Sequence, residues 1–185
     1  MNQTRCRWCN LKNPIYIEYH DCEWGQLNTD DAYLYEMLLL ESFQAGLSWE
    51  CVLNKRKSFR IAYDYFDIDK VCTYGDEKKN ELFQNKDIIR NKLKINASIK
   101  NSQIFKRIVL EYGSFYRYLC QFTHGEIIYE TDKTTNELSD AISHDLKKQG
   151  MTFVGSTIIY SYLQAIGMVV SHEKDCFLSP KGAIT

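Results

Sequence analysis

Hydrophobic residues recur at helical spacing through most of the chain. The first strong repeat follows Asp30 and Asp31, whose negative charge suits the N-terminus of a helix. One face of this predicted helix carries Leu34, Met37, Leu38 and Glu41. Gly46 is expected to end the helix, and Ser48 to cap a second helix that extends to about Tyr63.

The same periodicity predicts further helices at 77–84, 92–112, 115–122, 135–149 and about 155–170. Residues 151–154, between two glycines, are expected to form a buried loop, and residues 125–133 a loop or a short strand. The only prolines, Pro14 and Pro180, lie near the ends, so the interior can run as successive helices. We therefore predict a single all-α domain that spans residues 1–185.

A chain of 185 residues can bury about 70% of its unfolded surface and should fold without disulfides. It has seven cysteines, an odd number, and no segment of signal-peptide type. We therefore expect a reducing cytoplasm, where thiols stay free or bind metal. No hydrophobic run approaches the roughly 18 residues that span a bilayer, so no membrane role is expected.

The formal net charge of −1 conceals a basic block. Residues 51–107 contain 14 Lys or Arg against 7 Asp or Glu, whereas the remainder contains 9 against 17. Such a block can face a polyanion such as DNA while the rest of the surface repels it. A solvated helical surface that carries lysines is the alternative interpretation.

Potential metal ligands occur near both ends of the chain. One set, which would close the chain into a ring, is Cys6, His20, His172 and Cys176. Thiolates and imidazoles of this kind bind Zn²⁺ tetrahedrally and leave no position open for a substrate. A local alternative is Cys6, Cys9, His20 and Cys22. The third interpretation is that these residues are ordinary buried thiols and imidazoles without a metal.

Glu41 lies on the helix face that is expected to pack against the core. Burial of a carboxylate there is costly unless a partner or ligand interacts with it. Aromatic residues occur on either side of it, at Trp8, Tyr16, Tyr19, Trp24 and Trp49. Rings around one carboxylate suit a flat, electron-poor heterocycle. The alternatives are plain core packing for the rings and, for Glu41, a carboxylate that bends out to water.

Four separated segments of the chain resemble the 3-methyladenine DNA glycosylase I family. They are Tyr-His-Asp-Cys-Glu-Trp-Gly at 19–25, Glu-Ser-Phe-Gln-Ala-Gly-Leu-Ser-Trp at 41–49, Phe-Val-Gly-Ser-Thr at 153–157 and His-x-x-x-Cys at 172–176. Their order and spacing match the family over nearly the whole chain. The resemblance implies an all-helical fold of the helix-hairpin-helix glycosylase superfamily, with a structural zinc site that joins the termini.

The resemblance also implies a role for individual residues. The zinc ligands of the family fall on Cys6, His20, His172 and Cys176, which leaves Cys9 and Cys22 as incidental. The carboxylate, tyrosine and stacking tryptophan of the base pocket fall on Glu41, Tyr19 and Trp49, and further lining falls on Trp8, Tyr16 and Trp24. Gly46 and Leu47 match the turn that the family pushes into the DNA stack beside the lesion.

The hairpin departs from the superfamily pattern. Its best match is residues 85–93, where Asp87 and Leu93 replace two expected glycines. An aspartate beside a phosphate is unfavourable, so we expect the hairpin to bind DNA through Arg90, Lys92 and the amides around Ile89.

The activity that the resemblance implies is hydrolysis of the N-glycosidic bond of 3-methyladenine in double-stranded alkylated DNA. The products are the free base and an abasic site. No lysine lies in the segment 41–49, so water rather than an amine is the expected nucleophile. We expect a monomer with one structural Zn²⁺. The other classes that remain open are a helical module that binds lesions without cutting and a zinc hydrolase.

Overall fold

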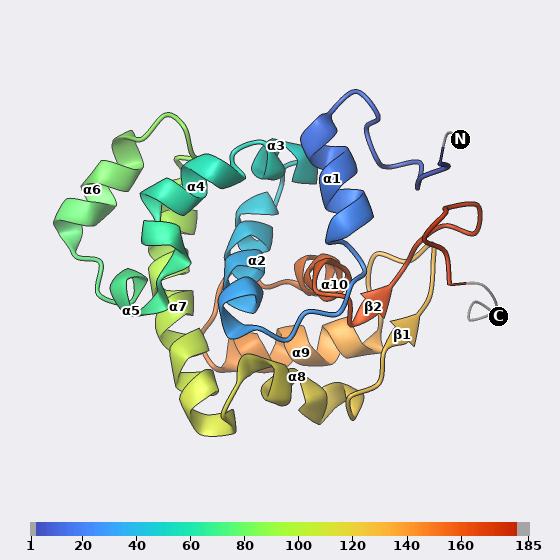
Figure 1. Ribbon diagram of the computed structural model, residues 1–185. Helices are drawn as coiled ribbons and strands as arrows, with labels where there is room; N and C mark the ends of the chain where they lie inside the picture. Colours follow the sequence, from blue (N-terminus) through green and yellow to red (C-terminus); the bar gives the residue numbers. More distant parts are fainter. Residues whose placement is uncertain (1–2, 181–185) are drawn as a thin grey trace.

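A buried helix, α2 (Asp31–Gln44), lies at the centre of the computed structural model, which describes residues 3–180 (Figure 1). Asp30 caps it by accepting a hydrogen bond from the Tyr33 amide at 3.3 Å, as the sequence predicts. Every side chain from Leu34 to Phe43 is buried. A helix that is buried on all sides needs neighbours all round, and α3, α7, α8 and α10 pack against α2.

The other helices of residues 3–180 surround α2. In chain order they are α1 (Pro14–Cys22), α3 (Trp49–Leu53), α4 (Arg56–Ala62), α5 (Ile68–Val71), α6 (Asp76–Gln84), α7 (Lys92–Tyr112), α8 (Phe115–Thr123), α9 (Glu137–Lys148) and α10 (Ser156–Ala165), with a 3₁₀ turn, η1 (Asp64–Phe66), after α4. In Figure 1, α6 lies at one side of the molecule and both chain ends lie at the other. The prediction of a helical domain is confirmed.

One short parallel strand pair adds to the predicted all-α fold. Strand β1 (Ile128–Tyr129) pairs with β2 (Val169–Val170). The sequence left β1 open as a loop or a strand, but it placed residues 166–170 in a helix, and that part of the prediction was wrong. The cause is Gly167, which has φ +77°, and a Cβ there would lie 2.2 Å from the backbone carbon of Gln26. The chain therefore leaves α10 and turns into β2.

A second difference concerns the helix predicted from Ser48 to Tyr63. Ser48 does cap a helix, since its hydroxyl accepts from the Cys51 amide, but α3 ends after five residues and α4 is a separate helix. Asn54 at the junction accepts a hydrogen bond from the Asn13 side chain at 2.9 Å. Tertiary contacts of this kind are invisible to helical periodicity. Helix α1 was not predicted, although Asn13 and Pro14 are local signals for a helix start.

Helix α7 has the predicted bounds. Asn91 caps its start by accepting from the amides of Leu93 and Lys94, and Gly113, with φ +82°, ends it. Helix α6, the loop 85–91 and α7 form a helix, a hairpin and a second helix, as predicted. The predicted buried loop at 151–154 is also present, with Met151 and Val154 inside the core.

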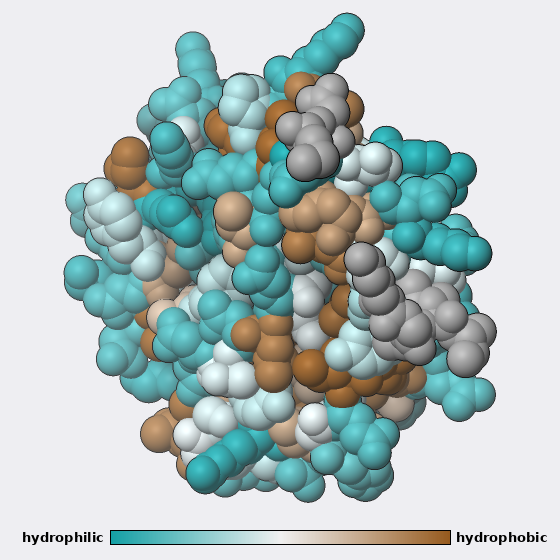
Figure 2. All heavy atoms as spheres, turned by 45° about the vertical axis from the view of Figure 1, so that its right-hand side comes forward, coloured by the Kyte–Doolittle hydropathy of each residue, from teal (hydrophilic) through white to brown (hydrophobic). Residues whose placement is uncertain are grey.

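Figure 2 shows the face on the side of the chain ends, which is mainly hydrophilic with separate smaller hydrophobic areas. None of the helices in residues 3–180 has both the length and the hydrophobicity that a membrane crossing requires.

Candidate active site and metal centre

Four buried ligands meet where the two ends of the chain come together. Cys6, His20, His172 and Cys176 place one ligand atom each within 4.8 Å of all the others. The Cys176 sulfur lies 3.5 Å from His20 Nε2 and 3.6 Å from His172 Nδ1, and the Cys6 sulfur lies 3.6 Å from the same His172 atom. A zinc ion with ordinary Zn–S and Zn–N bonds separates tetrahedral sulfur and nitrogen ligands by about 3.5 Å. The cluster therefore has the size and chemistry of a metal site.

Outer contacts orient the two imidazoles. His20 Nδ1 bonds Asp21 at 2.7 Å, which directs Nε2 to the cluster, and Arg5 holds that carboxylate through two nitrogens. Such carboxylate–histidine pairs commonly support metal ligands. Gly25, with φ +75°, allows His172 to approach, because a Cβ there would lie 3.0 Å from Nε2. Burial lowers the pKa of His172 to about 4, so the ring is neutral, as a metal ligand must be.

The local ligand set is excluded by the geometry. The Cys9 thiol points to the Tyr16 carbonyl at 3.8 Å, and Cys22 is exposed on the outside of α1. Neither belongs to the cluster. Of the two ligand sets, the one that joins the two ends of the chain is therefore the one that the structure assembles.

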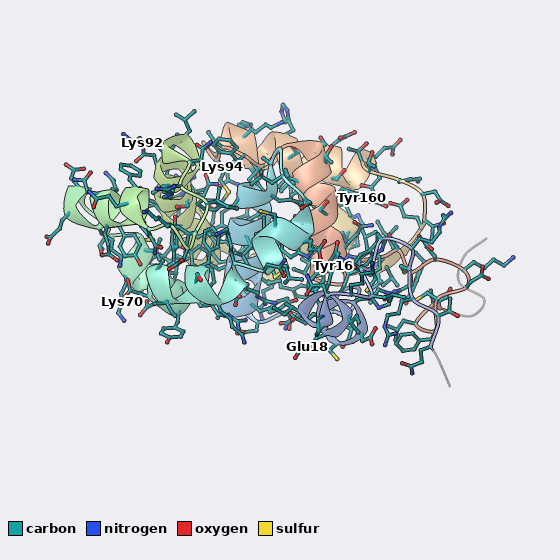
Figure 3. All side chains as sticks on the ribbon, turned by 90° about the horizontal axis from the view of Figure 1, so that it is seen from above. Tyr16, Glu18, Lys70, Lys92, Lys94 and Tyr160 are labelled. Carbon is teal, nitrogen blue, oxygen red and sulfur yellow. The ribbon has the colours of Figure 1, made fainter. Side chains whose placement is uncertain are left out.

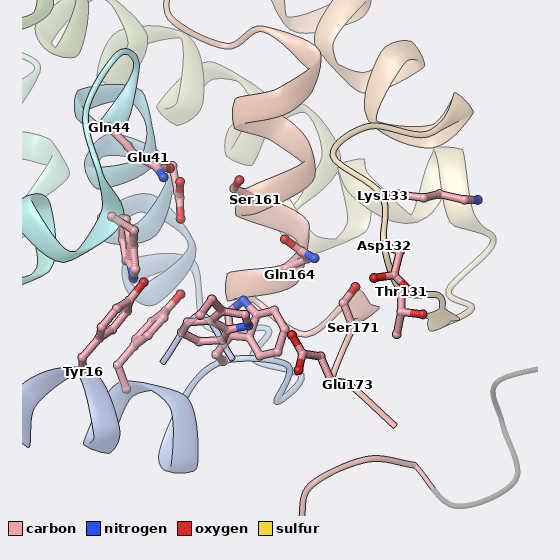
Figure 4. Close-up of a pocket in the computed structure, with 14 residues that line it drawn as sticks. Tyr16, Glu41, Gln44, Thr131, Asp132, Lys133, Ser161, Gln164, Ser171 and Glu173 are labelled. Atoms are coloured by element: carbon pink, nitrogen blue, oxygen red, sulfur yellow. The ribbon is translucent and has the colours of Figure 1, made fainter. Parts of the chain in front are cut away.

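Figure 4 shows an aromatic cavity of about 360 Å³. It adjoins the cluster, because Trp8 and Trp24, which line it, contact His20 and His172. Every pocket residue that the sequence suggested lines it, namely Trp8, Tyr16, Tyr19, Trp24, Glu41 and Trp49. Helix α1 supplies two of them, because Tyr16 and Tyr19 are three residues apart and share a face. Asn13 and Pro14 start this helix, the first by capping the Ile15 amide at 3.1 Å. The two ends of the chain and α2 thus contribute to one site.

Glu41 is the most deeply buried carboxyl group of the cavity. Its side chain projects from α2 into the cavity (Figure 4), yet the residue is only 2% exposed. Its Oε2 atom is buried and has no hydrogen-bond partner among the described residues. Burial raises the pKa of this carboxyl well above its ordinary value, which favours the neutral acid. A cation placed beside Glu41 would favour the ionised form.

Three further pocket groups lack partners. Trp49 Nε1, a donor, Gln44 Oε1, an acceptor, and the Ser171 hydroxyl are buried without a hydrogen bond within residues 3–180. Buried polar groups without a partner are rare in folded proteins and can mark a functional site. The pocket therefore presents aromatic faces together with unused donors and acceptors, which suits a flat heterocycle with polar edges.

The pocket rests on the metal cluster. The rings of Trp8 and His20 have centroids 5.2 Å apart, and those of Trp24 and His172 lie 4.7 Å apart. Trp8 and Trp24 also contact each other at 4.7 Å. His20 and His172 of the cluster thus support the two walls of the cavity that Trp8 and Trp24 form.

Several lining residues were missed by the sequence analysis. They are Gln44, Thr131, Asp132, Lys133, Ser161, Gln164, Ser171 and Glu173. Ser161 and Gln164 are three apart on α10 and both face the cavity (Figure 4), a helical signal that could have identified them. Residues 131–133 lie in the loop after β1 and gave no such signal. Lys133 is not a free amine, because its nitrogen pairs with Glu130 at 2.6 Å.

The basic block is more neutralised than its composition indicates. Carboxylates pair with Arg56, Arg60, Lys70, Lys78, Lys79 and Lys106. On the hairpin, Arg90 and Lys92 are exposed, and so is Asp87, which replaces a glycine of the superfamily pattern. Gly46 and Leu47 are exposed at the end of α2, and Leu47 is a large hydrophobic residue with 42% of its surface accessible.

The helical fold and the ring-lined pocket define a class, a helical protein with a helix-hairpin-helix segment and an aromatic cavity around one buried carboxyl group. The model of the methyladenine glycosylase family matches residues 8–179. DNA-3-methyladenine glycosylase 1 of Escherichia coli is 40% identical over 183 residues, which cover 95% of this chain and 97% of that protein. The chain belongs to the methyladenine glycosylase family.

Solved structures agree in fold. A crystal structure of 3-methyladenine DNA glycosylase I matches with a TM-score of 0.91 at 39% identity, over 96% of this chain and 100% of that one. A variant of 3-methyladenine DNA glycosylase I in complex with 3-methyladenine matches with a TM-score of 0.90 at 31% identity, over 96% and 98% of the chains.

Proposed function

We propose that this chain removes 3-methyladenine from alkylated double-stranded DNA by hydrolysing the N-glycosidic bond. The observation that carries the proposal is Glu41, a buried carboxyl group among aromatic rings, whose Oε2 atom has no hydrogen-bond partner within residues 3–180. The named activity of the similar proteins supports it. The reaction would be the first step of base-excision repair.

The chemistry of the substrate fits this carboxylate. Methylation at N3 gives adenine a positive charge, which weakens the bond between N9 and C1′ of the sugar. When that bond breaks, its electron pair goes to N9 and the base leaves neutral, so no acid is needed to protonate it. Positive charge moves to the sugar, and water adds to C1′ and loses a proton. A carboxylate near this path stabilises the developing charge.

Glu41 would therefore bind the exocyclic amine edge of the cationic base and favour positive charge during bond cleavage. The raised pKa of Glu41 would favour the cationic base over neutral adenine. Beside neutral adenine the carboxyl group would stay protonated, whereas a cationic base would favour its ionised form. Tyr19 would orient the base and Trp49 would stack on it; their rings already contact each other, with centroids 5.3 Å apart. Trp8, Tyr16 and Trp24 would complete the wall.

Access to the pocket requires that the nucleotide leave the helix stack. We assign this step to the turn at Gly46 and Leu47, which would enter the space beside the lesion. The hairpin would hold a phosphate through Arg90 and Lys92. Asn91 already occupies the amides of Leu93 and Lys94, so the free amides would be those around Ile89. Asp87 would have to point away from the phosphate.

The metal cluster would hold one Zn²⁺ through Cys6, His20, His172 and Cys176. Zinc there would tie the termini together and supply no chemistry, because four protein ligands complete a tetrahedral site. The zinc-hydrolase alternative loses support for this reason. Our expectation that the protein is a monomer remains a prediction.

Release of free base is the test. Methylated duplex DNA is incubated with excess enzyme, and the released bases are separated and quantified. We expect 3-methyladenine to appear with an equal number of abasic sites, and unmethylated DNA of the same sequence to release nothing. Tight binding without any release would make the protein a lesion-binding module instead.

A further inference from the structure

Lys94 is buried although it carries a charge. It lies in the first turn of α7, directly after the hairpin, and is only 6% exposed. Its ammonium pairs with no carboxylate within residues 3–180, in contrast to many lysines of the block. A buried, unpaired charge is costly unless hydrogen bonds hold it. Burial of this ammonium group therefore requires hydrogen-bond acceptors around it.

The ammonium donates to two backbone carbonyls at the end of α2. Lys94 Nζ lies 2.8 Å from the oxygen of Phe43 and 2.5 Å from that of Ala45. It also lies 5.9 Å from the ring centroid of Phe153. Carbonyls at a helix C-terminus have no partner within the helix, and a cation there is favourable. Figure 3 marks Lys94 and Lys92 at the start of α7, and Lys92 instead lies over Phe83 of α6 at 5.4 Å.

The second carbonyl belongs to the turn that exposes Leu47. Ala45 has φ −44° and ψ 114°, Gly46 has φ +77°, and the Leu47 amide bonds the Gln44 carbonyl at 2.6 Å. These values describe a type II turn from Gln44 to Leu47, with glycine where φ is positive. Types I and II differ in the direction of the central peptide, whose oxygen is the Ala45 carbonyl. Lys94 therefore holds the group that distinguishes the two turns.

A second lysine fixes the hairpin from the other side. Lys55 Nζ donates to the carbonyls of Lys86 and Asp87, at 3.5 and 3.1 Å. The hairpin is thus attached to the α3–α4 junction, and the start of α7 is attached to the turn. Hairpin and turn form one connected unit on the proposed DNA face.

We propose that Lys94 is a positioning residue that locks the Gln44–Leu47 turn in its type II form and sets Leu47 in register with the hairpin. The inference rests on the proposed function, because it concerns how the turn enters DNA. Lys94 would act through Leu47 and would touch neither the base nor a phosphate.

The test compares Lys94→Met, which keeps the shape and loses the donors, with Lys148→Met as the control, an exposed lysine of α9 outside the basic block whose replacement should leave the rate unchanged. Single-turnover release of 3-methyladenine from duplex DNA should fall about tenfold to a hundredfold in Lys94→Met, since a displacement of about 1 Å can cost about 10² in rate. Affinity for free 3-methyladenine, measured by tryptophan fluorescence, should change less than about twofold, because the pocket is intact. Circular dichroism establishes that the variant is folded at the assay temperature.

A double-mutant cycle with Leu47→Ala separates positioning from general stability. If Lys94 acts through Leu47, Lys94→Met should cost little further rate once Leu47 is truncated. Additive losses, or an equal loss of free-base affinity in Lys94→Met, would overturn the inference, and so would an unchanged rate on duplex DNA. Absence of base release by the wild-type enzyme would instead refute the proposed function, so the two failures are distinguishable.

Discussion

The rings of Trp24 and His172 lie 4.7 Å apart and cross at 88°, so a wall of the pocket stands directly on a ligand of the metal cluster. Trp24 is followed by Gly25, whose missing side chain lets His172 come close. The segment that begins at Tyr19 therefore serves both sites, with Tyr19 and Trp24 facing the cavity and His20 the cluster. Disturbance of the cluster should reach the pocket through these rings.

Replacement of Cys176 by Ser should remove the metal and loosen both ends of the chain. Metal content, measured by elemental analysis, should fall from about one Zn²⁺ per chain toward zero. Tm should drop by more than about 6 °C, because loss of a metal is among the largest destabilising changes and about 1 kcal/mol shifts a domain of this size by about 2–4 °C. Base release should weaken as Trp24 loses its support.

Two matched cysteine variants are the controls for this prediction. Cys9→Ser and Cys22→Ser should retain full metal content, since neither thiol belongs to the cluster. Full occupancy in Cys176→Ser, or metal loss in the Cys9 variant, would contradict the assignment.

Removal of one hairpin cation should make DNA binding less sensitive to salt. Arg90→Ala and Lys92→Ala should each reduce the slope of log affinity against log salt by about one, because each would delete one phosphate contact. Lys148→Ala, at the far end of α9, is the control and should leave the slope unchanged. If Arg90→Ala and Lys92→Ala both keep the wild-type slope, DNA lies against another face.

Helical periodicity predicted the elements that are defined by local signals. Asn91 and Gly113 bound α7 at the predicted residues because a cap and a left-handed glycine are both short-range features. Pairing of β1 with β2 depends on partners 41 residues apart in register, Ile128 and Val169, which periodicity cannot reveal. The wrong extension of the last helix has the same origin.

The residues of the candidate site also divide into those that local sequence signals reveal and those that only tertiary contacts reveal. Residue type and the motif spacing singled out Glu41, which lines the pocket, and the four residues of the Cys and His cluster, because an acid on a hydrophobic face and paired Cys and His are unusual by themselves. Lys94 was counted in a basic block as a surface charge, yet it points inward to Ala45. Nothing in the sequence indicates which lysine of a helix start meets a carbonyl of another helix.

Glu41→Gln should stabilise the free protein at neutral pH. In the unfolded chain the carboxyl ionises near 4.5, whereas burial raises its pKa in the fold. The folded state therefore binds more protons between these two values, and stability falls as pH rises through that window. Glutamine does not titrate and avoids this loss. Thermal unfolding should give Tm at least about 2 °C above wild type at about pH 8 and a smaller gain at about pH 5. A gain that is equal at both pH values would contradict the raised pKa.

The same substitution should harm the reaction. Glu41→Gln keeps the shape of the side chain but cannot carry negative charge, so it loses the group that favours a cationic base and the charge that develops on the sugar. Single-turnover release of 3-methyladenine should fall by about 10², the usual effect of removing one preorganised electrostatic group. Glu41→Ala should be slower still, because it leaves a cavity and unpaired donors such as Trp49 Nε1. Non-specific DNA binding should stay nearly constant in both. A stable Glu41→Gln enzyme that releases base at the wild-type rate would remove Glu41 from the mechanism, and stacking and nucleotide flipping would then have to account for catalysis.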